Sequence, residues 1–278
     1  MATRLVDAGH DVCVWNRTPG SAAAVVERGA SEAGSPAEAA GGAEVVMTML
    51  AGPDALEAVV FGPDGLAEGM ARHAALVDMS TVGPDAVRSV EHRLPAGVDM
   101  LDAPVLGSVP QATEGTLKIF VGGPEPAFER LRPVLDVLGT PRYLGPIGAG
   151  AAMKLVANST LGALMCGLAE ALAVGDALGL DEAVMLDILA DSPIGTTVRS
   201  KRTMIERGEY PPNFALALAA KDLRLVTGAA HDAGLRLRLA PAARDWLEQA
   251  DAEGLGGLDY SAVIAEVRGR PARPAAPT

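Results

Sequence analysis

Lys154 and Asn158 stand out in an apolar, helix-favouring segment that follows Gly148. Because an α-helix turns once in about 3.6 residues, side chains four positions apart project from the same face. In a partly desolvated cleft the pKa of a lysine falls, and the side chain can then transfer a proton. On this helix alone, a simpler interpretation is favoured: a lysine that reaches solvent at the helix edge, beside an ordinary polar asparagine. The rest of the chain has to decide between the two.

The composition sets broad limits on the fold and on the partners. The chain has 278 residues, enough for two domains, and 49% of them are hydrophobic but only 3% aromatic. We therefore expect a core of Ala, Val, Leu and Met. The formal net charge of −12 argues against nucleic acid or an anionic membrane as the main partner.

Cysteines, histidines and apolar runs give no sign of a metal site, a secreted protein or a membrane protein. Cys13 and Cys166 are far apart and read as reduced thiols of a cytoplasmic protein. The four histidines lie in unrelated segments without ligand spacing, so no metal is predicted. No signal peptide is visible, and the most apolar segment, 155–169, is too short and polar to span a bilayer.

The first half of the chain alternates short apolar runs with helical patterns. Expected strands cover residues 11–16, 44–50, 75–79, 99–106, 117–121 and 142–144, and expected helices cover 1–9, 19–28, 53–60, 84–94 and 125–138. This alternation predicts a doubly wound α/β domain of Rossmann type, with a mainly parallel sheet covered on both faces.

After Gly148 the pattern becomes helical throughout. Helices are expected at 149–180, 181–191, 196–207, 214–233, 239–253 and 259–268. We therefore predict a Rossmann-like domain at 1–147, an all-helical domain at 148–268 joined to it by a long helix, and a disordered tail at 269–278. Lys154 lies just past the junction, and ligand sites favour domain interfaces, which favours a functional role for it.

Asn16-Arg17-Thr18 ends the first strand-like run. In dinucleotide-binding folds an acidic residue here holds the 2′-hydroxyl of NAD, whereas an arginine accommodates the 2′-phosphate of NADP. The acidic residue is absent and Arg17 is present, so the tripeptide favours NADP(H) over NAD(H). By itself it is a weak signal, because an arginine in a turn is more often solvated.

Two further segments place polar groups after strands. Ser80 and Thr81 could contact ribose or substrate, or could cap the helix that starts near Pro84, and local sequence does not separate these alternatives. The turn at Gly107-Ser108 has backbone amides and a hydroxyl that could hold a carboxylate. A later Lys221-Asp222 pair on a helix is uninformative alone.

The order of these motifs resembles that of the β-hydroxyacid dehydrogenase family over nearly the whole chain. The matching runs are Ala-Gly-His-Asp-Val…Asn-Arg-Thr, Asp-Met-Ser-Thr, Asp-Ala-Pro-Val-x-Gly-Ser…Gly-Thr-Leu…Val-Gly-Gly, Gly-x-Gly-x-x-x-Lys-Leu-x-x-Asn and Lys-Asp-Leu. One such run would be weak support, whereas five in sequence are strong.

The resemblance implies a role for individual positions of this chain. Lys154 matches the catalytic lysine, the general acid in carbonyl reduction, and Asn158 would orient the reacting oxygen and the substrate carboxylate. Substrate contacts are implied for Leu106, Gly107, Ser108 and Phe214. Cofactor contacts are implied for Asn16, Arg17, Thr18, Met49, Leu50, Ala51, Thr81 and Lys221, although a proline is usual where Ala51 stands.

One departure from the family pattern concerns the start of the chain. The family begins with a strand and a G-x-G-x-x-G turn that holds the pyrophosphate, whereas Met1 to Gly9 matches the helix after that turn. We therefore expect a longer cellular protein, whose start was assigned at an internal methionine. For the chain as printed, we expect weak cofactor binding and low stability.

The resemblance implies an NADP(H)-dependent oxidoreductase that interconverts a small 3- or 4-hydroxy acid with its aldehyde or keto form. A homodimer or dimer of dimers is expected by analogy. One alternative is an imine reductase, although aspartate or tyrosine usually replaces the lysine in that class. Another is a non-catalytic cofactor-binding module, as in relatives that have lost the lysine.

Overall fold

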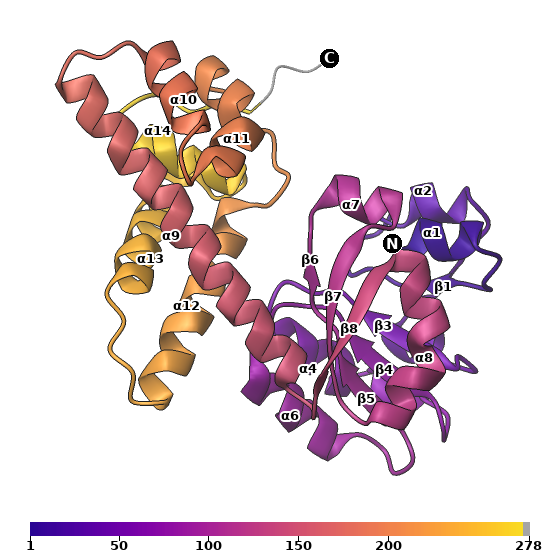
Figure 1. The fold of residues 1–278 in the computed structure, drawn as a ribbon. Coiled ribbons are helices and arrows are strands. Elements are labelled where there is room, and N and C mark those ends of the chain that lie inside the picture. Colours follow the sequence, from indigo (N-terminus) through magenta and orange to yellow (C-terminus); the bar gives the residue numbers. More distant parts are fainter. Residues whose placement is uncertain (275–278) are drawn as a thin grey trace. The chain divides into compact units, whose positions relative to one another are not determined.

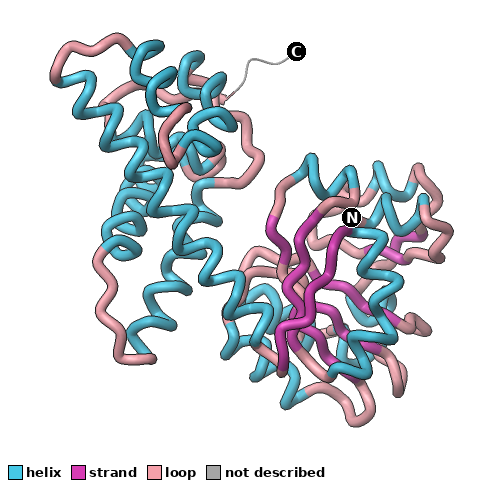
Figure 2. Tube along the Cα trace, in the orientation of Figure 1, coloured by secondary structure: helices cyan, strands magenta, loops and turns pink. Residues whose placement is uncertain are grey.

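The computed structural model describes residues 1–274 and divides into two compact units, Met1–Lys154 and the part from Leu155 onward. The division falls inside one long helix, α9 (Ala149–Ala177). All named strands precede this helix (Figure 2). The chain is therefore an α/β unit followed by a helical unit, as the sequence predicts.

A six-stranded mixed sheet forms the centre of the first unit. Its order is β3-β4-β5-β7-β6, with β8 paired to β7. The β3–β4, β4–β5 and β7–β8 pairings are parallel, whereas β7 runs antiparallel to β5 and β6. The strands are β3 (Val45–Thr48), β4 (Ala75–Asp78), β5 (Asp99–Asp102), β6 (Val105–Leu106), β7 (Leu117–Gly122) and β8 (Gly139–Gly145).

Helices cover both faces of this sheet, as Figure 1 shows for α8 on one face and α4 and α6 on the other. Successive strand residues point to opposite faces, so Leu76 packs with one layer of helices and its neighbour Val77 with the other. The central strand β4 is buried along its whole length. Such a strand is typical of a sheet with two covered faces.

Several elements of the first unit differ from the sequence prediction. Helix α2 is only Ala23–Val26, because Gly20 takes a left-handed conformation (φ 80°) within the expected helix. The expected strand 99–106 is divided between β5 and β6 at Pro104, which has no N–H to donate. The unexpected elements are β2 (Ser31–Glu32), α3 (Pro36–Ala40), α5 (Leu66–Gly69) and α7 (Val109–Glu114).

The remaining elements of this unit agree with the prediction to within a few residues. The helices are α1 (Ala2–Asp7), α4 (Pro53–Phe61), α6 (Pro84–Arg93) and α8 (Glu125–Leu138). Strand β1 (Cys13–Val14) pairs in parallel with β2 in a separate two-stranded sheet. Within residues 1–274, no strand pairing joins this small sheet to the larger one.

The second unit packs its helices around one apolar core that includes Met165, Leu172, Leu186 and Val263. After α9, the elements are α10 (Glu182–Ala190), α11 (Gly195–Arg207), α12 (Leu216–Asp232), α13 (Leu239–Ala250), a π-turn at Asp251–Leu255, a 3₁₀ turn at Tyr260–Ala262 and α14 (Val263–Val267). Aromatic residues are scarce here, so aliphatic and methionine side chains fill the core, as the composition suggests.

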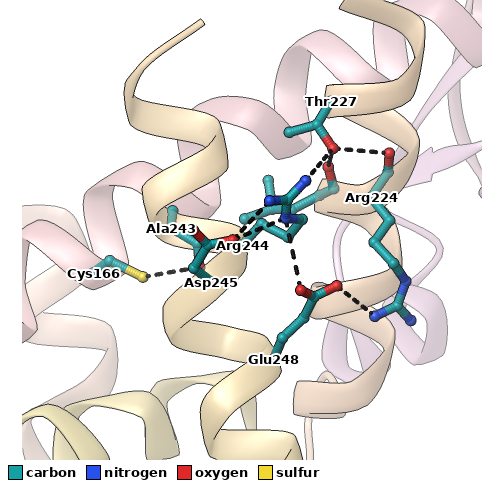
Figure 3. A network of polar contacts seen from close by, with 8 residues as sticks. Cys166, Arg224, Thr227, Ala243, Arg244, Asp245 and Glu248 are labelled. Atoms are coloured by element: carbon teal, nitrogen blue, oxygen red, sulfur yellow. Dashed lines mark hydrogen bonds and ion pairs between the residues drawn. The ribbon is translucent and has the colours of Figure 1, made fainter. Parts of the chain in front are cut away.

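Helices α12 and α13 are joined by a polar network at their surface (Figure 3). The Arg244 guanidinium donates to the Thr227 hydroxyl and forms ion pairs with Asp245 and Glu248, and Glu248 also pairs with Arg224. On the α9 side of α13, the buried Cys166 thiol donates weakly to the carbonyl of Ala243. Burial raises the pKa of the Cys166 thiol to about 12, so it stays protonated as a small core residue.

Helix α9 is longer than the expected apolar segment 155–169. By length and composition it could cross a membrane, and 44% of its most apolar window is buried inside the structure. The expectation that this helix is too short to span a bilayer is therefore wrong. A core helix passes the same test of length and hydropathy, so the test does not indicate a membrane span.

The expected tail at 269–278 is described as far as residue 274. In this part the Tyr210 N–H donates to the Arg273 carbonyl at 2.9 Å, and the Arg273 N–H donates to the Gly208 carbonyl. Residues 275–278 lie outside the described residues.

Candidate active-site residues in the two units

Three buried polar side chains end neighbouring strands at the carboxyl edge of the sheet. Thr48 ends β3, Asp78 ends β4 and Asp102 ends β5, and the register places Asp78 beside both of the others. The carboxyl edge is where ligands bind in open α/β sheets. Asp78 and Asp102 each hold a segment that contains residues predicted to belong to the site.

Asp78 holds the loop Met49–Ala51 through a short chain of hydrogen bonds. The Leu50 N–H donates to the Ser80 hydroxyl at 2.8 Å, and that hydroxyl donates to Asp78 Oδ1 at 2.6 Å. The Thr48 hydroxyl donates to the same carboxylate oxygen at 2.7 Å. The loop that the resemblance places under the nicotinamide is therefore fixed to the sheet at its middle residue, while Met49 and Ala51 are exposed.

The structure accounts for the Ser80 side chain. The residue at the N-cap position of α6 is Gly83. Ser80 is buried and bonded to Asp78 and Leu50, so its hydroxyl does not cap α6. Thr81 is partly exposed, and its contact with a ligand stays a prediction.

Asp102 lies against the start of α9. Its carboxylate accepts from the Gly148 N–H at 2.7 Å and from the Ala151 N–H at 2.6 Å. Burial raises the pKa of Asp102 to about 6, an effect that the two N–H donors oppose and the nearby Asp78 charge reinforces. Lys154, partly exposed, follows Ala151 by three residues on the same helix.

Asp222 brings together two predicted residues of the second unit. The buried Asn158 amide donates to Asp222 Oδ2 at 2.5 Å, and the Lys221 ammonium pairs with Asp222 Oδ1 at 2.5 Å. In the sequence, this Lys-Asp pair alone is uninformative. A signal was present, because Asp222 lies among the small and apolar residues of the buried face of α12. A charge on such a face needs a polar partner.

The turn Asn16–Thr18 follows β1 and is exposed. Asn16 Oδ1 accepts from the Thr18 N–H at 3.0 Å, which forms an Asx-type turn. Arg17, at the tip of this turn, extends an exposed side chain, and no acidic residue stands within the tripeptide. This arrangement suits an anion such as a 2′-phosphate.

The turn Leu106–Ser108 connects β6 to α7. Gly107 has φ 137°, and a Cβ there would lie 2.8 Å from the Leu117 side chain, so glycine is required. The Ser108 N–H donates to Gln111 Oε1 at 2.8 Å, within α7. In this arrangement the Ser108 amide, expected to face a carboxylate, is bonded to Gln111.

Phe214 lies in the segment before α12 and is fixed by a residue that the sequence analysis did not single out. Its N–H donates to Asp259 Oδ2 at 3.3 Å, and its ring lies 5.6 Å from that of Tyr260. Asp259 also pairs with the Lys201 ammonium at 2.7 Å. Both charged groups are buried, so this pair has a structural role in holding the segment.

Two family profiles together match almost the whole chain. The NAD binding domain of 6-phosphogluconate dehydrogenase matches residues 1–150. The NAD-binding domain of NADP-dependent 3-hydroxyisobutyrate dehydrogenase matches residues 148–267. The change from one profile to the other coincides with the start of α9.

Individual proteins and solved structures show similarity to the same family of dehydrogenases. The chain is 37% identical to 3-hydroxyisobutyrate dehydrogenase of Pseudomonas aeruginosa, over 97% of this chain and 95% of the relative. It is 35% identical to glyoxylate/succinic semialdehyde reductase 1 of Arabidopsis thaliana, over 96% of this chain and 94% of the relative. The crystal structure of 3-hydroxyisobutyrate dehydrogenase from Salmonella typhimurium superposes with a TM-score of 0.85 at 28% identity, covering 95% of this chain and 94% of that one.

Proposed function

We propose that this chain, which belongs to the β-hydroxyacid dehydrogenase family, interconverts a small 3- or 4-hydroxy acid with its aldehyde or keto form. It is an NAD(P)-dependent oxidoreductase that acts on a CH–OH group. The observation that carries the finer proposal is the position of Lys154. It lies on α9 close after the two N–H groups that Asp102 binds.

In the proposed reaction Lys154 donates a proton to the carbonyl oxygen during reduction and removes it from the hydroxyl during oxidation. When bound, the nicotinamide cofactor supplies or accepts the hydride. Asn158 orients the reacting oxygen and the substrate carboxylate. Its own amide is held by Asp222, which limits the orientations that it can adopt.

The residues proposed to hold the cofactor fit a phosphorylated dinucleotide. Arg17 is exposed at the end of β1, and the Met49–Ala51 loop has a fixed middle residue and exposed neighbours. Asn16 and Thr18 complete the turn around Arg17, and Thr81 and Lys221 are assigned to the nicotinamide half by the family resemblance. We infer a preference for NADP(H) over NAD(H) from Arg17.

Replacing Arg17 tests this preference. For Arg17→Ala we expect the Kd of NADPH to rise roughly 10- to 100-fold, because a charge-assisted hydrogen bond contributes on the order of 1.5–3 kcal/mol. The Kd of NADH should stay the same, since NADH has no 2′-phosphate. Arg28→Ala, at another exposed arginine of the same unit, is the matched control and should change neither value. Equal losses for both cofactors in Arg17→Ala would refute the preference.

The proposed substrates carry a carboxylate. The Gly107-Ser108 turn is assigned to that group, and Leu106 and Phe214 to the apolar part of the substrate. A panel of glyoxylate, succinic semialdehyde, 3-hydroxyisobutyrate and a cyclic imine, each with NADPH or NADP⁺, would compare these classes. Turnover of the imine alone would favour the imine reductase alternative, and turnover of none would favour a binding module.

Lys154 is tested by two substitutions. Lys154→Ala should lower kcat by about 10²–10⁴-fold, the usual contribution of a general acid or base, while the Kd of NADPH changes little. Lys154→Arg should be nearly as slow, because an arginine keeps the charge but does not release its proton near neutral pH. Undiminished turnover in Lys154→Ala would remove this residue from the mechanism.

We also infer a homodimer or a dimer of dimers, located in the cytoplasm. The second unit exposes apolar side chains on neighbouring helices, among them Val174 and Leu178 near the end of α9 and Val184 and Ile188 on α10. Apolar surface of this kind favours association. Light scattering coupled to size exclusion would give the mass in solution, and a monomer at micromolar concentration would refute the assembly.

A further inference from the structure

The contact between Asp102 and α9 joins two segments that are remote in sequence. Both oxygens of the carboxylate are used, Oδ1 by the Gly148 N–H and Oδ2 by the Ala151 N–H. Gly148 immediately precedes α9 and Ala151 lies in its first turn, where the backbone N–H groups have no carbonyl partner within the helix. The last residue of β5 therefore caps the start of α9, and the first N–H group that it binds, that of Gly148, is 46 residues later in the chain.

Two glycines make this close approach possible. A Cβ on Gly122 would lie 2.5 Å from Asp102 Oδ1, and a Cβ on Gly150 would lie 2.9 Å from Oδ2. Any larger residue at either position would push the carboxylate away from the helix. The cap therefore depends on β5, on the end of β7 and on the helix itself.

Because the carboxylate holds two N–H groups three residues apart, it fixes both the axial position and the rotation of the first turn. Lys154 is three residues beyond the second of these groups and belongs to the same compact unit. Proton transfer requires a distance defined to within a fraction of an ångström, so small shifts of this turn would affect the rate strongly.

We propose that Asp102 is a positioning residue for Lys154: it clamps the N-terminal turn of α9 to the carboxyl edge of the sheet and so sets where the lysine amine is presented. The proposal rests on the proposed function of Lys154. Asp102 itself touches neither substrate nor cofactor in this assignment. It acts through the backbone of Gly148 and Ala151.

The charge of the carboxylate matters to this clamp. An ionised carboxylate accepts from both N–H groups, whereas protonation turns one oxygen into a donor that faces an N–H. Burial raises the pKa of Asp102 to about 6, so the clamp weakens as the pH falls through that value. The charged groups of the surrounding elements are Asp78 on β4, Arg88 of α6, beside Gly148, and Lys154 of α9.

Asp102→Asn is the direct test, because it keeps the size of the side chain but replaces one acceptor by a donor. We expect kcat to fall 10- to 100-fold, with the KM of the substrate and the Kd of NADPH within about twofold of the wild type. The decline of wild-type kcat below about pH 6 should be absent from the variant. Hydrogen exchange of residues 148–155 should be faster in the variant than in the wild type.

Asp181→Asn is the matched control, since Asp181 caps α10 through its side chain in the other unit. It should leave kcat and the exchange of residues 148–155 unchanged. Unchanged exchange in Asp102→Asn would overturn the clamp whatever the reaction is. Faster exchange with unchanged kcat would overturn the positioning role. A wild-type protein that turns over none of the substrates would instead overturn the proposed function, and this proposal with it.

Discussion

Two buried aspartates, one in each unit, meet different kinds of donor. Asp102 in the α/β unit accepts from two backbone N–H groups and has another carboxylate, Asp78, beside it. Asp259 in the helical unit pairs with the Lys201 ammonium and also accepts from the Ser261 hydroxyl and from backbone N–H groups. Both side chains are completely buried.

The different donors have different consequences for the two carboxylates. Neutral donors leave the negative charge of Asp102 uncompensated, so its ionisation is costly and its pKa is raised. The charge of Asp259 is paired with the Lys201 ammonium, and the pair holds a segment in place. The first arrangement is suited to a pH-dependent site and the second to a fixed structural contact.

The largest effect on stability should follow from breaking the ion pair between Lys201 and Asp259. Lys201→Met leaves the Asp259 charge buried without its ammonium partner, and we expect a loss of about 3–5 kcal/mol in the free energy of unfolding of the helical unit. Denaturant unfolding in a Trp15→Phe background, followed through Trp246, would measure it. Lys118→Met, at an exposed lysine of the α/β unit, is the control. A loss below about 1 kcal/mol would mean that the hydrogen bonds of Asp259 suffice without the lysine.

A smaller, pH-dependent effect should follow from Asp102. Its pKa of about 6 in the folded protein is above the ordinary value of 3.8 for an aspartate, so the folded state binds more protons between these two pH values. Asp102 therefore contributes about 3 kcal/mol to the free energy of unfolding below about pH 4. This contribution is lost as the pH rises through 6. Unfolding of wild type and Asp102→Asn at pH 4.5, 6 and 8 would show it. A difference between them that stays constant with pH would contradict the raised pKa.

The smallest effect should come from the partly exposed ion pairs of Arg244 in Figure 3, where both charges are paired and reached by solvent. Arg244→Ala should lower the free energy of unfolding by about 1 kcal/mol or less, because partly exposed ion pairs are screened by water and salt. The loss should shrink further at 1 M salt. A loss as large as that of Lys201→Met would show that burial is not what separates the two kinds of contact.

The architecture was predictable because helices and strands each have a characteristic spacing of apolar residues along the sequence. Short apolar runs between helical patterns gave the sheet and its covering helices, and the helical part after Gly148 was recognised throughout. The direction of β7 was not predictable, since antiparallel pairing depends on the turn of residues 103–116 and not on the strand pattern. The division of β5 from β6 at Pro104 was foreseeable from proline chemistry.

The candidate site also has a part that could be predicted from the sequence and a part that could not. Lys154, Asn158 and Lys221 were found from the order of the motifs, which belongs to the sequence. The groups that hold them were not, because Asp102 and Asp222 act on partners 46 to 64 residues away. Partners so far apart in the chain leave no local pattern in the sequence. The only sign of them is a charged residue among apolar ones, because a buried charge needs a polar partner.

The class of fold and the family could therefore be predicted from the amino-acid sequence, since local periodicity and motif order need no tertiary contact. The same motif order led to the residues proposed to carry the chemistry. How those residues are held could be seen only in the folded protein. In it, Ser80 joins the Met49–Ala51 loop to Asp78, and Asp102 caps α9. The physical reason is that a buried carboxylate takes its donors from whichever backbone the fold brings to it.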